Sequence, residues 1–198
     1  MAGVPFVALT GGLGAGKSTA LQALERLGAA TLSTDAVVHE LYETSEVRDI
    51  VVARWGPDVA PGDAVDRRAV AARVFADPGE RAWLESELWP RVRARVAAWR
   101  AEVGERRPLP VAAVVEAPLL FEAEMQETYD ATITVIAPEA VRAERAAARG
   151  HVAPAEREAR HLSQEEKARR ATFAVDNVAT VQDLERELSS VLARLTAS

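Results

Sequence analysis

The sequence predicts an α/β fold, a parallel sheet of five strands with helices on both faces. Two observations support this prediction. Short apolar runs alternate with helical patterns along most of the chain, as in proteins built on a covered parallel sheet. The chain has 198 residues, of which 48% are hydrophobic and 27% charged, which is the ordinary balance of a globular protein with one core.

Each expected element follows from its local pattern. The expected strands are short apolar runs at residues 4–10, 29–33, 111–116, 131–137 and 172–175. Helical spacing is found at residues 18–27, 35–42, 46–55, 66–76, 84–99, 139–149 and 181–195. Pro90 lies within one of these helices and is predicted to break or kink it, because proline removes a backbone donor and clashes with the preceding turn.

Composition excludes several classes of function. The net charge of −6 argues against a surface for nucleic acid or an anionic membrane. The absence of cysteine rules out disulfides, thiol nucleophiles and cysteine-based zinc sites. The longest uncharged run, residues 1–16, is too short for a membrane helix and has no basic start like that of a signal peptide. We therefore expect a cytoplasmic protein. A monomer or weak homo-oligomer is expected separately, since the sequence does not show the oligomeric state.

A glycine-rich segment follows the first expected strand and opens a helix. Residues 11–18 read Gly-Gly-Leu-Gly-Ala-Gly-Lys-Ser and fit the phosphate-binding P-loop pattern, in which glycines let backbone N–H groups converge on phosphates. Lys17 would bridge the β- and γ-phosphates of ATP, and the Ser18 hydroxyl would ligate Mg²⁺. The expected nucleotide-binding residues here are Gly12, Leu13, Gly14, Ala15, Gly16, Lys17, Ser18 and Thr19. An incidental glycine turn is the alternative, and the strand–turn–helix context argues against it.

The remaining motifs narrow the class of P-loop protein. The chain has two lysines, Lys17 and Lys167, and neither can supply the Asn-Lys-x-Asp motif of a GTPase. The loop type excludes a protein kinase. The third strand ends in Glu116-Ala117-Pro118, unlike the acidic pair usual in motor ATPases. A small-molecule kinase fits best.

Such a kinase needs a group for the acceptor hydroxyl, cations for the developing charge and a cover against water. Asp35 follows the second strand at the edge where the P-loop also lies, so it is the candidate for the hydroxyl. A helix N-cap is an equally open reading of Asp35. Arg142, Arg145 and Arg149 share one helix face and could clamp phosphates. The alternative for these arginines is a solvated face paired with neighbouring glutamates.

These parts divide the predicted P-loop fold into three. We predict a nucleotide-binding core of residues 1–35, 109–137 and 171–198, a helical insertion of residues 36–108 on the substrate side, and a helical lid of residues 138–170. Residues 150–170 would be the mobile cover. Lys167 lies near Glu165 and Glu166 and is expected to be a surface residue.

Over nearly its whole length the chain resembles the dephospho-CoA kinase family. The resemblance lies in the P-loop, in Asp35, in Arg145 and Arg149, and in the segments at residues 66–78, 117–122 and 175–177. It is most specific in the Pro-Leu-Leu-x-Glu turn at 118–122 and in Asp176-Asn177. The resemblance implies ATP-dependent phosphorylation of the 3′-hydroxyl of dephospho-CoA, giving CoA and ADP.

The resemblance also implies roles for individual residues. Asp35, Lys17 and Arg145 would be catalytic, with Asp35 positioning or deprotonating the hydroxyl. Arg145, Arg149 and Asn177 would bind ATP, Asn177 near the adenine, although a strand-end turn also explains Asn177. The expected substrate-binding residues are Asp35, His39, Arg67, Trp89, Pro118, Leu119 and Leu120. Plain packing remains an alternative for residues 118–120.

Four positions depart from the family's pattern. Ser33 stands where the family has the first aspartate of its Asp-x-Asp segment, and His39 where it usually has arginine. Trp89 replaces a histidine and could either stack on an adenine or pack in the core. His161 replaces a glutamine. Two other functions stay open: a P-loop kinase for another small molecule, such as a nucleoside monophosphate, and a non-catalytic ATP-binding module.

Overall fold

The computed structural model of this chain describes residues 3–62, 64–148 and 162–197. It divides the chain into two compact units. One is formed by Met1–Leu32 and Arg100–Ser198, and the other by Ser33–Trp99. The predicted division into three parts, with a separate lid at residues 138–170, stays a prediction.

The first unit is built on the predicted five-stranded parallel sheet, in the order β2-β3-β1-β4-β5. The strands are β1 (Phe6–Gly11), β2 (Ala30–Ser33), β3 (Ala113–Glu116), β4 (Ala131–Ile136) and β5 (Phe173–Asp176). Strand β1 lies at the centre, parallel to β3 on one side and β4 on the other. All its residues are buried, which explains its unbroken apolar sequence.

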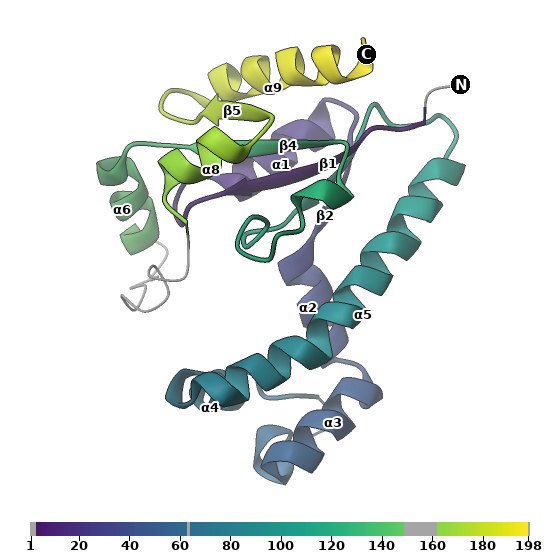
Figure 1. The fold of residues 1–198 in the computed structure, drawn as a ribbon, viewed down its shortest axis with the longest axis vertical. Helices are drawn as coiled ribbons and strands as arrows, with labels where there is room; N and C mark the ends of the chain where they lie inside the picture. The colour runs from purple at the N-terminus through teal and green to yellow at the C-terminus, as the bar shows by residue number, and fades with distance from the viewer. Residues whose placement is uncertain (1–2, 63, 149–161, 198) are drawn as a thin grey trace. The chain divides into compact units, whose positions relative to one another are not determined.

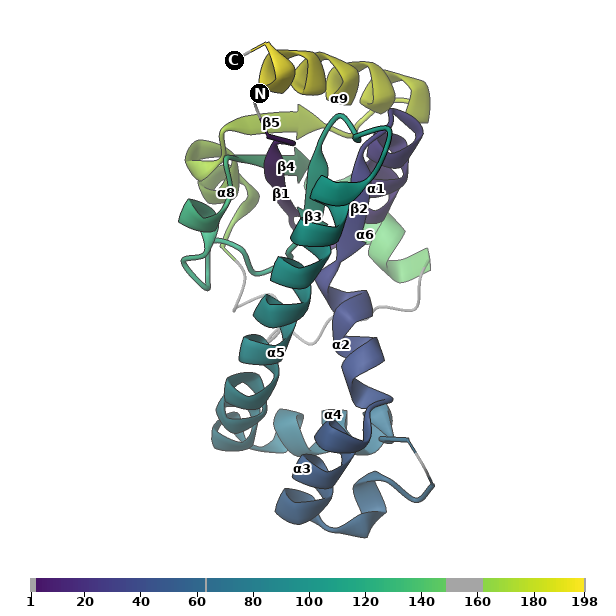
Figure 2. The same cartoon turned by 90° about the vertical axis from the view of Figure 1, so that its right-hand side faces the viewer.

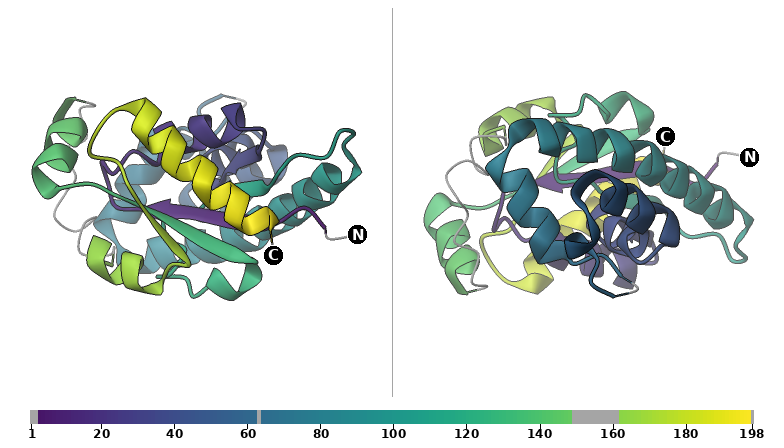
Figure 3. Two further views of the ribbon diagram at one scale, coloured as in Figure 1. Left: turned by 90° about the horizontal axis from the view of Figure 1, so that it is seen from above. Right: turned by 90° about the horizontal axis from the view of Figure 1, so that it is seen from below.

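Helices cover the sheet as expected. The unit's helices are α1 (Lys17–Arg26), α6 (Glu139–Ala148), α8 (Gln164–Arg170) and α9 (Val181–Thr196), with a 3-10 turn η2 (Gln126–Thr128). Helix α9 crosses the strands (Figure 3) and shares a core with α1, while α8 lies in front of the strands in Figure 1. Val7, Leu9 and Ile133 of the sheet belong to this core, together with residues of α1 and α9.

After Ser33, which ends β2, the regular structure of the second unit's described residues is helical (Figure 2). It holds α2 (Thr34–Tyr42), α3 (Ser45–Trp55), the 3-10 turn η1 (Pro57–Val59), α4 (Arg67–Ala76) and the first part of α5 (Pro78–Glu105). Its core is a separate apolar cluster of Val47, Val51, Val59, Val65, Val70, Leu84 and Leu88.

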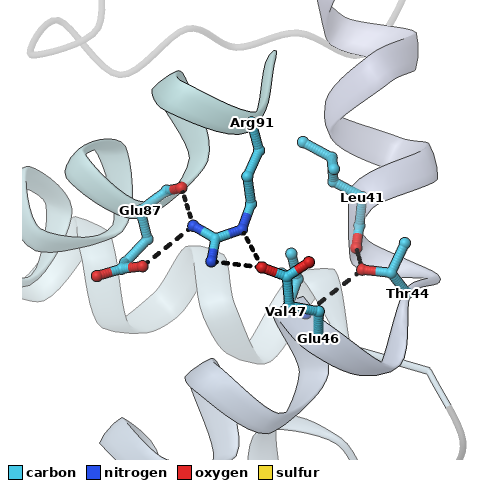
Figure 4. Close-up of polar contacts among 6 residues, drawn as sticks. All are labelled: Leu41, Thr44, Glu46, Val47, Glu87 and Arg91. Atoms are coloured by element: carbon cyan, nitrogen blue, oxygen red, sulfur yellow. Dashed lines mark hydrogen bonds and ion pairs between the residues drawn. The ribbon is translucent and has the colours of Figure 1, made fainter. Parts of the chain in front are cut away.

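Polar contacts fasten α3 within this unit (Figure 4). The Thr44 hydroxyl caps α3 by accepting a hydrogen bond from the backbone N–H of Val47 at 3.3 Å. Arg91 on α5 donates to the Glu46 carboxylate through Nη2 at 2.7 Å and through Nε at 3.0 Å. The same guanidinium pairs with Glu87 at 3.2 Å, so one side chain links two helices.

Of the predicted break or kink at Pro90, the break does not occur, and α5 changes direction along its course (Figure 1). Helix α5 runs as one element from Pro78 to Glu105 with Pro90 inside it. Buried Leu84 and Leu88 hold the turns before the proline in the unit's core, and the Arg91 guanidinium donates to the Glu87 carbonyl next to it. Core packing of these leucines, together with the local Arg91 hydrogen bond, therefore keeps α5 continuous through the proline. Among the helices of the described residues, none is long and apolar enough to span a membrane.

Tyr129 gives a test of the first unit's packing at high pH. Its ring stacks on Phe6 with centroids 4.6 Å apart, and burial raises its pKa from 10 to about 12. Because the folded-state pKa exceeds the unfolded one, the stabilisation is present below pH 10 and is lost as the pH rises through 12. A shift of this size corresponds to about 3 kcal/mol.

We predict that in a Tyr42→Phe background the phenolate absorbance of Tyr129 titrates near pH 12. In that background, Tyr129→Phe should flatten the fall in unfolding free energy above pH 10. A midpoint near 10 would contradict the burial described here.

Candidate phosphate-binding site

Backbone geometry shapes the loop between β1 and α1. Gly14 and Gly16 have φ values of 73° and 96°, in the left-handed region that favours glycine. A Cβ at Gly14 would lie 2.4 Å from the Arg142 carbonyl oxygen, and one at Gly16 would lie 2.0 Å from Asn177 Nδ2. Both glycines are therefore required by conformation and by space.

The first turn of α1 has the features of an anion site. Gly16 is the N-cap residue; no side chain caps this end of the helix in the described structure, and its first turn holds no acidic residue. Backbone N–H groups at such an end attract phosphate oxygens. Ser18 is exposed in this turn and Thr19 is half-buried, so the Ser18 hydroxyl can reach a cation from solvent.

Cationic side chains surround the loop. Lys17 Nζ donates to the carbonyl oxygens of Gly11 and Gly12, both at 3.1 Å. On α6, Arg142 Nη1 lies 3.5 Å from the Leu13 carbonyl oxygen, and Arg145 Nη1 donates to the Asn177 carbonyl at 3.2 Å. The structure therefore brings Lys17, Arg142 and Arg145 to one place. Arg149, His161 and most of the expected cover lie outside the described residues.

Asn177 connects the end of β5 to the loop. Its side chain is buried, and Nδ2 donates to the Ala15 carbonyl at 2.8 Å. Its backbone N–H donates to the Ile136 carbonyl, also at 2.8 Å. The contact to Ala15 fixes the loop from its buried side. A role beside the adenine of ATP stays a prediction.

The turn after β3 lies at the same sheet edge. Thr10 Oγ1 donates to the Pro118 carbonyl at 3.3 Å, which joins this turn to the last residues of β1. Pro118 and Leu119 are partly exposed, whereas Leu120 is 1% exposed and belongs to the core. Whether any of the three lines an acceptor site stays a prediction.

Lys167 is not the surface residue that its sequence neighbours suggested. Its side chain is fully buried, and Nζ pairs with Glu122 Oε1 at 2.9 Å. Burial lowers the pKa of the Lys167 ammonium below its usual value, and Glu122 opposes that effect. Burial would raise the pKa of the Glu122 carboxyl, but hydrogen bonds from Lys167 and the Leu162 N–H outweigh it and hold this pKa below its usual value.

Gln164, also on α8, is a second residue whose contacts sequence reasoning missed. Its side-chain amide bonds both backbone groups of Ala137, Oε1 accepting at 3.0 Å and Nε2 donating at 2.8 Å. Gln164 Cγ also lies 3.3 Å from where a Cβ of Gly12 would stand. The rarity of lysine in this arginine-rich chain was the one local signal that Lys167 on α8 has a specific role.

The other expected site residues belong to the second unit. Asp35 is exposed in the first turn of α2, whose N-cap is Ser33, so the N-cap reading of Asp35 is wrong. His39 is one turn later on α2 and also exposed, and Arg67 is the exposed first residue of α4. Trp89 on α5 is 40% exposed, which excludes a core position. The placement of these four residues against the loop stays a prediction.

No protein-only metal centre is evident in the part of the chain that the structure describes, since no three His, Cys, Asp or Glu side chains cluster there. A P-loop site does not need one, because phosphate oxygens of the nucleotide and water molecules supply most of the ligands of Mg²⁺. Ser18 remains the predicted protein ligand.

Comparison with known proteins decides the family. A model of the dephospho-CoA kinase family matches residues 5–183. The chain belongs to the dephospho-CoA kinase family. A dephospho-CoA kinase of Deinococcus radiodurans is 41% identical over 190 residues, covering 94% of this chain and 90% of the relative.

Solved structures agree with this family assignment. A crystal structure of a Thermus thermophilus protein matches with a TM-score of 0.79 and 33% identity, covering 98% of this chain and 100% of the other. A dephospho-CoA kinase from Campylobacter jejuni matches with a TM-score of 0.67 over 98% of both chains; at 22% identity this likeness concerns the fold alone. The predicted family and the predicted P-loop kinase fold are both confirmed.

The loop geometry predicts a sharp effect of adding one methyl group. Gly16→Ala should lower the unfolding free energy by at least about 1 kcal/mol, because an L residue is strained at this φ, and should weaken Mg-ATP binding by at least about tenfold. The matched control is Gly104→Ala in α5, where a Cβ meets nothing within 4 Å; it should stabilise by about 0.5–1 kcal/mol. Denaturant unfolding and titration calorimetry measure both effects. Unchanged ATP affinity in Gly16→Ala would contradict this account of the loop.

Proposed function

We propose that this protein transfers the γ-phosphoryl group of ATP to the 3′-hydroxyl of dephospho-CoA, yielding CoA and ADP. The single observation that carries the donor half is the loop at Gly11–Ser18 with Lys17, Arg142 and Arg145 gathered around it. Family membership supports the acceptor half.

Phosphoryl transfer asks the protein mainly for positioning and charge stabilisation. The loop N–H groups and the start of α1 would hold the β- and γ-phosphates, and Lys17 would exchange its carbonyl contacts for phosphate oxygens. Arg145 would balance the charge that spreads over the transferring group. Mg²⁺, held through Ser18 and the nucleotide, would supply further charge neutralisation when bound.

Asp35 is the proposed group for the acceptor. As the hydroxyl oxygen forms its bond to the γ-phosphorus, the bond to the ADP oxygen breaks and the hydroxyl proton goes to the Asp35 carboxylate. His39 lies one turn further along α2 and would share a helix face with Asp35. Pro118 and Leu119 would contact the acceptor, and Arg67 and Trp89 more distant parts of it.

Two other candidate functions make different predictions. A nucleoside monophosphate kinase normally shows an Asp-Gly-x-Pro-Arg segment after the third strand, where this chain has Glu116-Ala117-Pro118-Leu119-Leu120. A non-catalytic ATP-binding module would bind ATP with no acceptor-dependent turnover.

A coupled assay of ADP release separates these functions. With Mg-ATP, dephospho-CoA should stimulate ADP release strongly, AMP should not, and Lys17→Ala should abolish turnover. Stimulation by AMP alone would overturn the acceptor, whereas ATP binding without stimulation by either compound would favour the non-catalytic module.

The proposed role of Asp35 predicts a separation of kcat from nucleotide binding. Asp35→Asn keeps the shape but removes the proton acceptor, so kcat should fall by at least about a hundredfold while Mg-ATP affinity stays unchanged. Asp49→Asn is the matched control, because Asp49 is a 72% exposed aspartate on α3, and it should keep full activity. Full activity in Asp35→Asn would remove Asp35 from the mechanism.

A further inference from the structure

A buried ion pair lies at the sheet edge outside the phosphate loop. Lys167 on α8 is fully buried and donates through Nζ to two acceptors, the Pro118 carbonyl at 2.8 Å and Glu122 Oε1 at 2.9 Å. Pro118 is the first residue of the turn at residues 118–122, and Glu122 is the last. One ammonium group therefore holds both ends of this turn.

Both acceptors have a second donor. The Pro118 carbonyl also accepts from Thr10 Oγ1 at 3.3 Å, and Thr10 directly precedes the loop. Glu122 Oε1 also accepts from the Leu162 N–H at 2.8 Å, in the segment that leads into α8. The network thus joins β1, the 118–122 turn and α8 within the first unit.

Stability alone does not account for this arrangement. Burying two charges costs desolvation free energy that their attraction barely offsets, and an apolar pair of similar volume often folds as well or better. The ion pair instead provides positional specificity, because an ammonium group fixes the positions of the oxygens that it binds. The position fixed here is that of residues 118–122.

The same helix contacts the nucleotide side through another residue. Gln164, one turn before Lys167, bonds the Ala137 backbone and lies over Gly12. The two contacts of α8 are therefore separable, Gln164 toward the phosphate loop and Lys167 toward the 118–122 turn.

We propose that Lys167 is a positioning residue for the acceptor: it holds Pro118 and Leu119 where dephospho-CoA must bind, without contacting the nucleotide. This inference rests on the proposed function. It requires that loss of the ion pair impairs use of the acceptor and leaves ATP binding intact.

The test removes both charges together, because Lys167→Met alone leaves a buried carboxylate without its cation and can prevent folding. The double variant Lys167→Met with Glu122→Gln keeps an acceptor for the Leu162 N–H. It should unfold within a few degrees of the wild type and bind Mg-ATP with unchanged affinity. Its KM for dephospho-CoA, and the dissociation constant by calorimetry, should rise at least about tenfold. Arg169→Met is the control, since Arg169 is 75% exposed on α8, and it should change neither quantity.

The outcomes separate this inference from the function on which it rests. If the folded double variant keeps the wild-type KM and dissociation constant for dephospho-CoA, Lys167 is only structural and the inference falls. If ATP affinity falls in parallel, the ion pair supports the whole sheet edge rather than the acceptor turn, and the inference falls as well. If the wild-type protein shows no turnover that depends on dephospho-CoA, the proposed function fails and takes this inference with it.

Discussion

The turn from β1 into α1 is the constraint on which the rest of the first unit depends. Strand β1 is buried at the centre of the sheet, so the loop that leaves it can bend only through left-handed glycines. Because these glycines and the neighbouring Gly12 have no side chains, other parts of the chain approach the backbone closely. Arg142 reaches it from α6, Asn177 from the end of β5 and Gln164 from α8.

This close packing explains how a loop of small residues can be rigid enough to bind phosphates. The Asn177 amide fixes the Ala15 carbonyl from the buried side, which leaves the opposite side of the loop for ligand. The cations come from Lys17, where the loop enters α1, and from the two arginines of α6. A preformed, positively charged cradle of this kind stabilises developing charge without reorganising during the reaction.

Sequence patterns predicted the features that depend on neighbouring residues. The five strands and the P-loop follow from local periodicity and spacing, whereas the family was suggested by a resemblance in its motifs. The structure and the comparisons confirm the fold and the family. The errors concern contacts between distant residues. Lys167 reads as exposed beside Glu165 and Glu166, yet its partner Glu122 lies far away in the sequence. Pro90 reads as a helix break or kink, and only the break is wrong, because α5 packs on a core that local sequence does not show. Asp35 was selected by its place after the second strand and the other acceptor residues of the second unit by resemblance, and the roles of all of them stay predictions.

The measurement that tests the central claim most directly is the fate of the γ-phosphoryl group. The protein is incubated with dephospho-CoA and ATP labelled in the γ-phosphate, and the products are separated and examined by phosphorus NMR. The account predicts one label per ADP formed, located on the 3′-oxygen of the acceptor. Label recovered only as inorganic phosphate, or on any other oxygen of the acceptor, would contradict it.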